Sequence, residues 1–309
     1  MYYISATKRC FFVFNLRQHT VTVSILANIL CLYSYLETNV MRFKKLQDVL
    51  LPPELKANID NAPKPLGSLD YDRWGYHRAS AYRAAAGVRF LYDHYFKVQA
   101  FGRENIPATG RVLIVANHSG YLPLDGALLA YSILSNPYAP RVPRAMIERL
   151  FTGIPYIGSF LSEIGAVTGQ TQNCLDMLKQ EEAVIVFPEG IRGTSKGFIN
   201  RYQLQRFGNG FMDIAIDTNT PIVPVGIVGC EEALPMFGNA KGMAKRFGLP
   251  YFPITVPFAI PTRVSLNFGE PLHFEGPIHS EDDLEAKVNV VKAKIRQLIS
   301  DAQHKHGVR

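Results

Sequence analysis

The chain contains the stretch Arg111-Val-Leu-Ile-Val-Ala-Asn-His-Ser-Gly-Tyr-Leu-Pro-Leu-Asp-Gly126, in which an apolar run ends at a polar cluster with His118 and Asp125. The apolar residues 112–116 are β-branched or aliphatic without alternation, a pattern that predicts a strand buried on both faces. Residues at the carboxyl end of such a strand line clefts. We therefore expect His118 and Asp125 at the edge of a cleft.

These two residues are suited to proton transfer. A histidine takes up a proton near neutral pH, and a carboxylate on its other ring nitrogen fixes the tautomer and stabilises the imidazolium. Six residues separate His118 from Asp125, and a continuous helix of that length would hold them ~10 Å apart. Gly120 and Pro123 interrupt such a helix, so a loop can bring the pair together. The alternative is a structural histidine, with Asp125 capping a helix over residues 126–134.

A second apolar run, residues 183–187, ends at the turn Phe187-Pro-Glu-Gly190, which is followed by Arg192. Together with Asn117-His118 and the downstream Asp125, this sequence resembles motifs I and III of the glycerolipid acyltransferase (PlsC-like, lysophospholipid acyltransferase) superfamily. The lead-in Phe101–Gly110 and the segment Pro221–Gly226, similar to motif IV, extend the resemblance over residues 97–271, about half the chain.

Two departures from the family pattern stand out. The usual motif I has four residues between His and Asp, and we interpret the six found here as the NHSGxLPxDG variant. The usual motif II is a glycine-rich turn that ends in arginine, whereas Gly165-Ala-Val-Thr-Gly169 has none. The chain therefore lacks one of the residues that bind phosphate in the family, so the sequence does not fix the identity of the acceptor's headgroup.

The resemblance implies acyl transfer in phospholipid biosynthesis. His118 would remove the proton of an acceptor hydroxyl as it attacks an acyl thioester, and Asp125 would hold His118, with neither a covalent enzyme intermediate nor a metal or other cofactor. The implied donor is acyl-CoA or acyl carrier protein, and the implied acceptor is a lysophospholipid such as 1-acylglycerol-3-phosphate. The residues expected to bind substrate are Asn117, Ser119, Gly120, Phe187, Pro188, Glu189, Gly190, Arg192 and Lys196.

The basic residues after the second motif suggest a phosphate clamp. Arg192 offers a planar fork of donors and Lys196 a flexible point charge; the alternative is a solvated basic loop. Glu189 would orient Arg192, accept a hydrogen bond from the acceptor hydroxyl, or pin the turn. Backbone amides of the turn Pro188–Gly190 are candidate donors to an oxyanion.

Two other functions compete with the transferase. Gly193-Thr-Ser-Lys-Gly197 matches the G-x-S-x-G nucleophile elbow, with Asp213 and His273 following in hydrolase order, so a serine hydrolase or lipase that uses Ser195 is one alternative. The elbow requires its serine directly between a strand and a helix, whereas Ser195 comes eight residues after Phe187. A catalytically silent membrane-binding module is the other alternative.

Composition agrees with a globular enzyme. The 309 residues are 47% hydrophobic and carry a net charge of +7, which favours anionic partners. Since no nucleic-acid-binding motif is present, we expect phosphorylated small molecules and an anionic membrane surface rather than nucleic acid. The spacing of the four cysteines fits neither a metal site nor a disulfide framework, so we expect neither.

Alternating strands and helices predict an α/β fold with a central, mostly parallel sheet flanked by helices and an N-terminal helical attachment. Residues 1–40 are a weak anchor, an interfacial helix or a non-native extension, because Met41 is an alternative start. Residues 41–96 are expected to hold a proline-rich linker over 51–72 and an amphipathic helix over 78–96, which lies either on an anionic membrane or in ordinary packing. Residues 97–303 are expected to form the acyltransferase domain that the resemblance implies.

Further elements follow from periodicity. Beyond the strands 112–116 and 183–187, we expect strands over 163–168, 222–228 and 264–268, and helices over 126–134, 172–180, 205–217 and 280–298, with a loop over 136–143 and a broken segment over 147–160. Residues 234–257 mix basic and aromatic side chains, which suits a bilayer interface or a packed insertion. We therefore expect membrane association at the cytoplasmic face.

Overall fold

The computed structural model describes residues 51–62, 69–119, 123–153, 156–247, 251–256, 258–276 and 278–306. The chain divides into two units, residues 1–50 and 51–309. The predictions for residues 1–40, namely an anchor, an interfacial helix or a non-native extension, lie outside the described residues. Among the helices that are described, none combines the length and the apolarity that crossing a bilayer would require.

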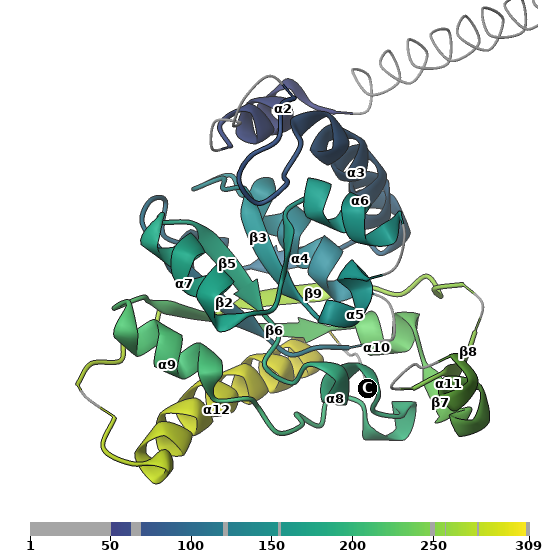
Figure 1. The fold of residues 1–309 in the computed structure, drawn as a ribbon. Coiled ribbons are helices and arrows are strands. Elements are labelled where there is room, and N and C mark those ends of the chain that lie inside the picture. Colours follow the sequence, from purple (N-terminus) through teal and green to yellow (C-terminus); the bar gives the residue numbers. More distant parts are fainter. Residues whose placement is uncertain are drawn as a thin grey trace, which may run out of the picture. The chain divides into compact units, whose positions relative to one another are not determined.

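A seven-stranded sheet organises the second unit, with the strand order β1-β9-β6-β2-β5-β3-β4. Neighbouring strands pair in parallel except β6 and β9, which are antiparallel. The fold class predicted from the sequence, a mostly parallel sheet flanked by helices, is confirmed (Figure 1). The strands are β1 (Gln99–Phe101), β2 (Val112–Ala116), β3 (Pro143–Ile147), β4 (Ala166–Thr168), β5 (Ala183–Val186), β6 (Ile222–Val228) and β9 (Ser265–Phe268).

Strand β2 is central and buried on both faces, as its uninterrupted apolar run predicts. Val112 and Ile114 belong to one hydrophobic cluster, and Leu113 and Val115 to the other. The first face is covered by α2 (Pro53–Asp60), α3 (Arg78–Phe90), its π-helical continuation η1 (Leu91–Tyr95) and α4 (Leu124–Leu134). The second is covered by α7 (Thr171–Lys179), α9 (Gly210–Asp217) and the long α12 (Glu281–His306).

Shorter elements complete the unit. The connections that follow β3, β5 and β6 begin with α5 (Arg149–Thr152), α8 (Ile191–Thr194) and α10 (Cys230–Ala233). Beyond α10 a two-stranded sheet of β7 (Met236–Asn239) and β8 (Pro253–Thr255) carries α11 (Lys241–Phe247) between its strands (Figure 1). The remaining elements are α6 (Ile157–Glu163) and the 3-10 helices η2 (Arg103–Asn105) and η3 (Phe198–Asn200).

The proline-rich segment is not an extended linker at its start. Residues 53–60 form α2, which tolerates Pro53 because the first turn of a helix needs no amide hydrogen at that position. Leu55 and Ile59 of this helix are buried in the first cluster. The helix predicted over 78–96 packs in the same cluster through Ala81 and Ala85, which supports the ordinary packing alternative.

Three predictions of secondary structure are wrong. β3 was not predicted: it lies between the loop predicted over 136–143 and the broken segment predicted over 147–160, because its Arg144 hides the apolar pattern. The buried guanidinium of Arg144 pairs with Asp72 and Glu182. Only residues 166–168 of the strand predicted over 163–168 are extended, since α6 runs to Glu163. The helix predicted from residue 205 begins at Gly210, because residues 205–208 are held by the turn after β5.

Candidate active site

The two sequence motifs meet at one edge of the sheet. β2 and β5 are parallel neighbours, with Val115 opposite Val186, so residues 117–119 and 187–190 leave the sheet side by side. Asn117 fastens this edge to β6 on the other side: its Nδ2 donates to Ile227 O at 3.0 Å, and Ile227 N donates to its Oδ1 at 2.7 Å. Asn117 is fully buried. It therefore holds the strand ends together, and the contact with substrate predicted for it is not supported by this burial.

His118 and Asp125 are in direct contact. His118 Nδ1 lies 2.7 Å from Asp125 Oδ2, and the described structure holds no hydrogen-bond partner for Nε2. The Asp125 carboxylate is wholly buried and also accepts hydrogen bonds from Ser119 N at 2.8 Å and Gly126 N at 2.7 Å. The Phe187 ring stacks on the imidazole, with 4.3 Å between centroids. These contacts fix the ring, while the His118 side chain stays 17% exposed.

The first turn of α4 supplies the carboxylate. Asp125 lies inside that turn, after Pro123 at the N-cap position, so it is not the helix cap of the alternative interpretation. The folded-back loop that the spacing requires therefore exists, although Gly120 in its middle lies outside the described residues. Ser119 is buried, and its hydroxyl lies 3.4 Å from Asp125 Oδ2. Its predicted contact with substrate is not supported by this burial.

Glu189 is a cross-link between three segments. Its side chain is buried; Oε1 accepts a hydrogen bond from His118 N at 3.0 Å and Oε2 accepts one from Gln205 N at 2.7 Å. Of the three roles predicted for Glu189, the contacts match pinning the turn. Pro188 is buried too, and its carbonyl accepts a hydrogen bond from Gly208 N at 2.8 Å. The turn thus holds both the backbone of the histidine and the segment 205–208.

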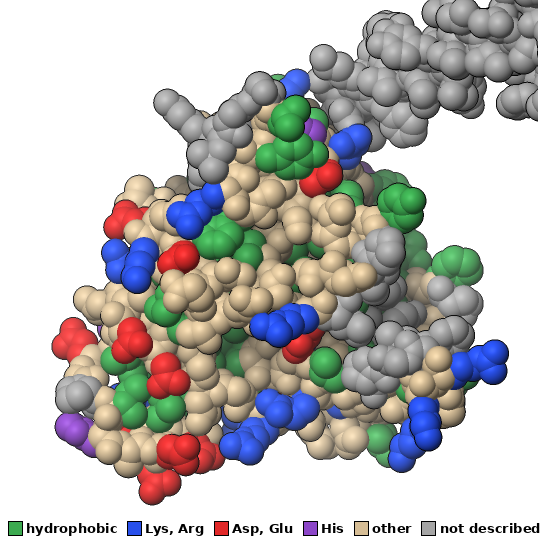
Figure 2. Space-filling view, in the orientation of Figure 1, with side chains coloured by type: hydrophobic (Ala, Val, Ile, Leu, Met, Phe, Trp, Pro, Cys, Tyr) green, Lys and Arg blue, Asp and Glu red, His purple; other side chains and the backbone are tan. Residues whose placement is uncertain are grey.

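Arg192 is the exposed cation nearest the turn in sequence. It lies in α8, and its backbone N donates to Glu189 O at 3.2 Å. Its side chain is exposed and has no ion-pair partner among the described residues. Figure 2 shows Lys and Arg side chains over the part of the surface where Figure 1 places α5 and α8. Arg192 remains available to an anionic ligand.

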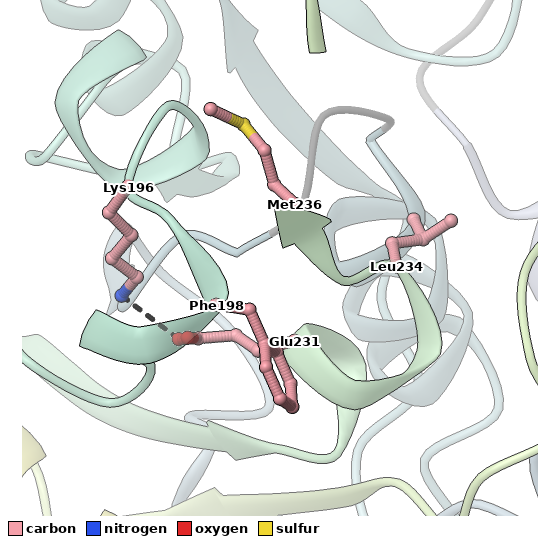
Figure 3. Close-up of a pocket in the computed structure, with 5 residues that line it drawn as sticks. All are labelled: Lys196, Phe198, Glu231, Leu234 and Met236. Atoms are coloured by element: carbon pink, nitrogen blue, oxygen red, sulfur yellow. Dashed lines mark ion pairs between the residues drawn. The ribbon is translucent and has the colours of Figure 1, made fainter. Parts of the chain in front are cut away.

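Lys196 is not the flexible charge that we predicted. Its side chain is only 4% exposed, and its Nζ lies 2.9 Å from Glu231 Oε1 and 4.0 Å from Glu189 Oε2 (Figure 3). Burial raises the pKa of Glu231 to about 7, although Lys196 opposes this shift. Lys196 therefore balances buried carboxylates behind the turn instead of reaching a phosphate.

A small cavity adjoins this ion pair. Its walls are Lys196, Phe198, Glu231, Leu234 and Met236 (Figure 3), and its free volume is about 10 Å³. A single water molecule needs about that much space. This cavity is therefore not an acyl-chain site.

Ser195 does not form a nucleophile elbow. It follows the last residue of α8, where its backbone N donates to Ile191 O at 2.9 Å. Among the described residues no hydrogen bond joins Ser195 to a histidine, and His273 is exposed with no such partner. The G-x-S-x-G match is a coincidence of sequence, because the strand here ends at the Phe-Pro-Glu-Gly turn instead.

Gly193 is a site residue that the motif search misassigned. A Cβ atom at this position would lie 2.9 Å from Glu189 Cβ and 3.0 Å from both Cβ and O of His118. Only glycine lets α8 approach the histidine this closely. In the sequence, Gly193 is the first glycine of the G-x-S-x-G match. Its position four residues after Glu189 was the signal that could have identified it as a site residue.

Comparisons with known proteins identify chains of similar sequence. Residues 97–228 match the family model described as Acyltransferase. An uncharacterized protein of Mycobacterium tuberculosis strain H37Rv is 40% identical over 195 residues, which are 60% of this chain and 54% of that protein. The human DGAT1/2-independent enzyme synthesizing storage lipids is 24% identical over 200 residues, 64% of this chain and 60% of that protein. The chain thus spans little more than half the length of these relatives.

A solved structure is similar in fold. The crystal structure of the 1-acyl-sn-glycerophosphate (LPA) acyltransferase PlsC from Thermotoga maritima superposes with a TM-score of 0.50 at 21% identity, covering 73% of this chain and 82% of that chain. Residues 97–228 of this chain therefore match the Acyltransferase family model, and the fold of the chain is similar to that of a PlsC acyltransferase.

Proposed function

We propose that the chain moves a fatty acyl group from an acyl thioester to the hydroxyl of a lysophospholipid, with His118 as general base. The observation that carries this proposal is the 2.7 Å contact between His118 Nδ1 and the buried Asp125 carboxylate. That contact directs the Nδ1 proton to Asp125 and leaves Nε2 as the acceptor nitrogen.

The reaction then proceeds by direct attack. His118 Nε2 takes the proton of the acceptor hydroxyl, whose oxygen forms a bond to the thioester carbonyl carbon. The carbon–sulfur bond breaks, and the thiolate leaves with the proton returned by the imidazolium. General-base catalysis of this kind contributes ~10² to 10⁴ in rate, so positioning and oxyanion stabilisation must supply the rest.

Of the backbone amides predicted as oxyanion donors in the turn Pro188–Gly190, one remains. Pro188 has no amide hydrogen, and Gly190 N donates to Phe187 O at 3.0 Å. Glu189 N is the remaining amide of the three, and it lies in the residue whose side chain holds the His118 backbone. We assign it the oxyanion contact.

The substrates follow from the same chemistry. A thioester is already activated, so acyl-CoA or acyl carrier protein suffices as donor without a metal or nucleotide. We place the acceptor among lysophospholipids, with 1-acylglycerol-3-phosphate as the first candidate and phospholipid biosynthesis as the context. The similarity to a PlsC-like fold supports this choice, and the storage-lipid relative makes a neutral glycerolipid the acceptor to compare.

The experiment measures free thiol released from acyl-CoA in the presence and absence of each acceptor. We expect acceptor-dependent release that falls ~10²-fold or more in His118→Ala. The matched control is His273→Ala, which removes an exposed histidine with no hydrogen-bond partner among the described residues. A hydrolase would instead release thiol without acceptor and lose activity in Ser195→Ala. No thiol release with any acceptor would leave the membrane-binding module as the function.

We further propose that the chain works on an anionic membrane surface at the cytoplasmic face. The β7–α11–β8 unit carries exposed apolar side chains, Phe237 at 66% and Ile254 at 51% exposure, beside the exposed Lys245 and Arg246 of α11. Such a combination suits headgroups and acyl chains together. Vesicle flotation with and without phosphatidylglycerol tests this: we expect binding to anionic vesicles that falls in Lys245→Glu/Arg246→Glu. Equal flotation of variant and wild type would contradict it.

A further inference from the structure

Lys196 lies at the centre of a buried polar cluster next to the Phe187–Gly190 turn. Its ammonium has three partners: Nζ is 2.9 Å from Glu231 Oε1, 4.0 Å from Glu189 Oε2 and 3.5 Å from Gln203 O (Figure 3). An ammonium group has three hydrogens to donate, so these contacts occupy it. Lys196 therefore acts on its buried neighbours and not on a substrate.

We propose that Lys196 is a positioning residue for His118 and that it acts through Glu189. The inference rests on the proposed acyl transfer, in which His118 is the general base. The two oxygens of Glu189 accept hydrogen bonds from His118 N at 3.0 Å and Gln205 N at 2.7 Å. An ionised carboxylate offers both oxygens as acceptors, whereas protonation converts one of them into a donor. The charge of Lys196 favours the ionised form at a side chain that has no exposed surface.

The loop 195–205, which contains Lys196, is fixed to the carboxyl end of β6. Tyr202 in this loop has a φ of 62°, a left-handed conformation that is costly for a residue with a side chain. Its backbone N donates to Glu231 Oε2 at 3.0 Å, and its hydroxyl accepts a hydrogen bond from Gly229 N at 2.9 Å. Glu231 thus binds the loop with one oxygen and Lys196 with the other. These contacts hold the ammonium in place behind the turn.

Buried negative charge exceeds buried positive charge in this cluster. Lys196 is within ion-pair distance of two carboxylates, and burial raises the pKa of Glu231 to about 7 although Lys196 opposes the shift. Lys292 of α12 is a second cation that faces Glu189, but it is partly exposed, so water screens its charge. Removal of the Lys196 charge therefore favours protonation of Glu189 and weakens its hold on the His118 backbone.

Two lysine variants test the effect on the reaction. Lys196→Met removes the charge and keeps a long side chain. We expect its kcat to fall ~10-fold or more with little change in KM, because a displaced base affects the reaction step and not substrate binding. Lys287→Met is the matched control, since it also removes a lysine paired with a carboxylate: Lys287 Nζ lies 2.6 Å from Asp283 Oδ1 in α12. It should keep the kcat of the wild type.

A second substitution shows through which carboxylate Lys196 acts. If Lys196 only neutralised Glu231, the variant Lys196→Met/Glu231→Gln, which removes both charges, would recover stability and kcat together. We expect this double variant to recover stability in urea relative to Lys196→Met, while its kcat stays ~10-fold below that of Glu231→Gln alone, because Glu189 still lacks its counter-charge. The double variant also provides the test if Lys196→Met fails to fold. In a Glu189→Gln background, Lys196→Met should lower kcat no further.

The nitrogen signals of the His118 ring report its position without turnover. Nuclear magnetic resonance spectra of the full chain carrying isotope-labelled histidine, with the His118 signals assigned from His118→Ala, measure this. We expect the His118 signals to shift in Lys196→Met and in the double variant, and to match the wild type in Lys287→Met.

Wild-type kcat and His118 signals in Lys196→Met, or recovery of kcat in the double variant, would overturn the proposal. These outcomes differ from a failure of the proposed acyl transfer. If no acceptor supports thiol release by the wild type, but the ring signals move in Lys196→Met and not in Lys287→Met, the positioning role stands and the proposed function fails. If the wild type transfers acyl groups and the double variant does so with the kcat of Glu231→Gln, the reverse holds.

Discussion

Gly193→Ala should lower activity through the position of His118, although residue 193 carries no reactive group. The added methyl would lie 2.9 Å from Glu189 Cβ and 3.0 Å from His118 Cβ and His118 O. Two of these are atoms on or next to the backbone of the base itself. Ordinary carbon contacts are ~3.5–4.0 Å, so His118 or α8 must shift by roughly half an ångström or more.

The size of the effect follows from this shift. Misplacement of a catalytic group by ~1 Å costs up to ~10² in rate, so we expect kcat to fall ~10- to 100-fold. Overpacking of a tight contact costs ~1–3 kcal/mol in the free energy of unfolding. KM for acceptor and donor should change little, because the added methyl contacts Glu189 and His118 rather than the exposed Arg192.

The assay compares three glycine-to-alanine variants by acyl transfer and urea unfolding. At Gly126 the new Cβ would lie 3.6 Å from the Phe187 ring, an ordinary contact, and at Gly87 in α3 it would meet nothing within 4 Å. Gly87→Ala should even stabilise the helix by ~0.5–1 kcal/mol. Wild-type kcat in Gly193→Ala, or an equal loss in Gly126→Ala, would refute the claim that α8 sets the position of the base.

Three further outcomes can be measured. Asp125→Asn should lower kcat ~10³-fold or more by favouring the wrong His118 tautomer, seen as a loss of acceptor-dependent thiol release at unchanged folding; a mild effect would contradict the pair. Arg144→Ala leaves the buried carboxylates of Asp72 and Glu182 unpaired and should lower the free energy of unfolding, measured in urea, by ~3–5 kcal/mol. Arg111→Ala breaks the more exposed pair with Glu181 and should lower it by ~0–1 kcal/mol. Since burial raises the pKa of Glu231 to about 7, its contribution to stability is present below its ordinary pKa and is lost as pH rises through about 7. Glu231→Gln should flatten the dependence of unfolding free energy on pH between 5 and 8, and an unchanged slope would refute this.

The two strands that carry the motifs could be predicted from the sequence because each is an uninterrupted apolar run. β2 and β5 are short apolar runs buried on both faces, and their parallel pairing follows from the helices between them. The contact between His118 and Asp125 was feasible from the spacing but not decided by it. The structure shows the contact, with Asp125 inside the first turn of α4.

The partners of charged residues could not be predicted. Lys196 and Arg192 are both basic and four residues apart, yet one is buried against Glu231 and the other is exposed. Their difference depends on Glu231, which follows the carboxyl end of β6 and is distant in sequence. The strand β3 was missed for a similar reason, because Arg144 looks like a surface residue until Asp72 and Glu182 enclose it.

Glu189 links the base to the segment that precedes α9. One carboxylate oxygen accepts the His118 amide and the other accepts the Gln205 amide, next to Arg206. Since both oxygens are already engaged, Glu189 has little capacity left for substrate. The glutamate of the turn thus acts on the proposed reaction by holding the backbone of His118 in a fixed relation to the turn and to the segment 205–208.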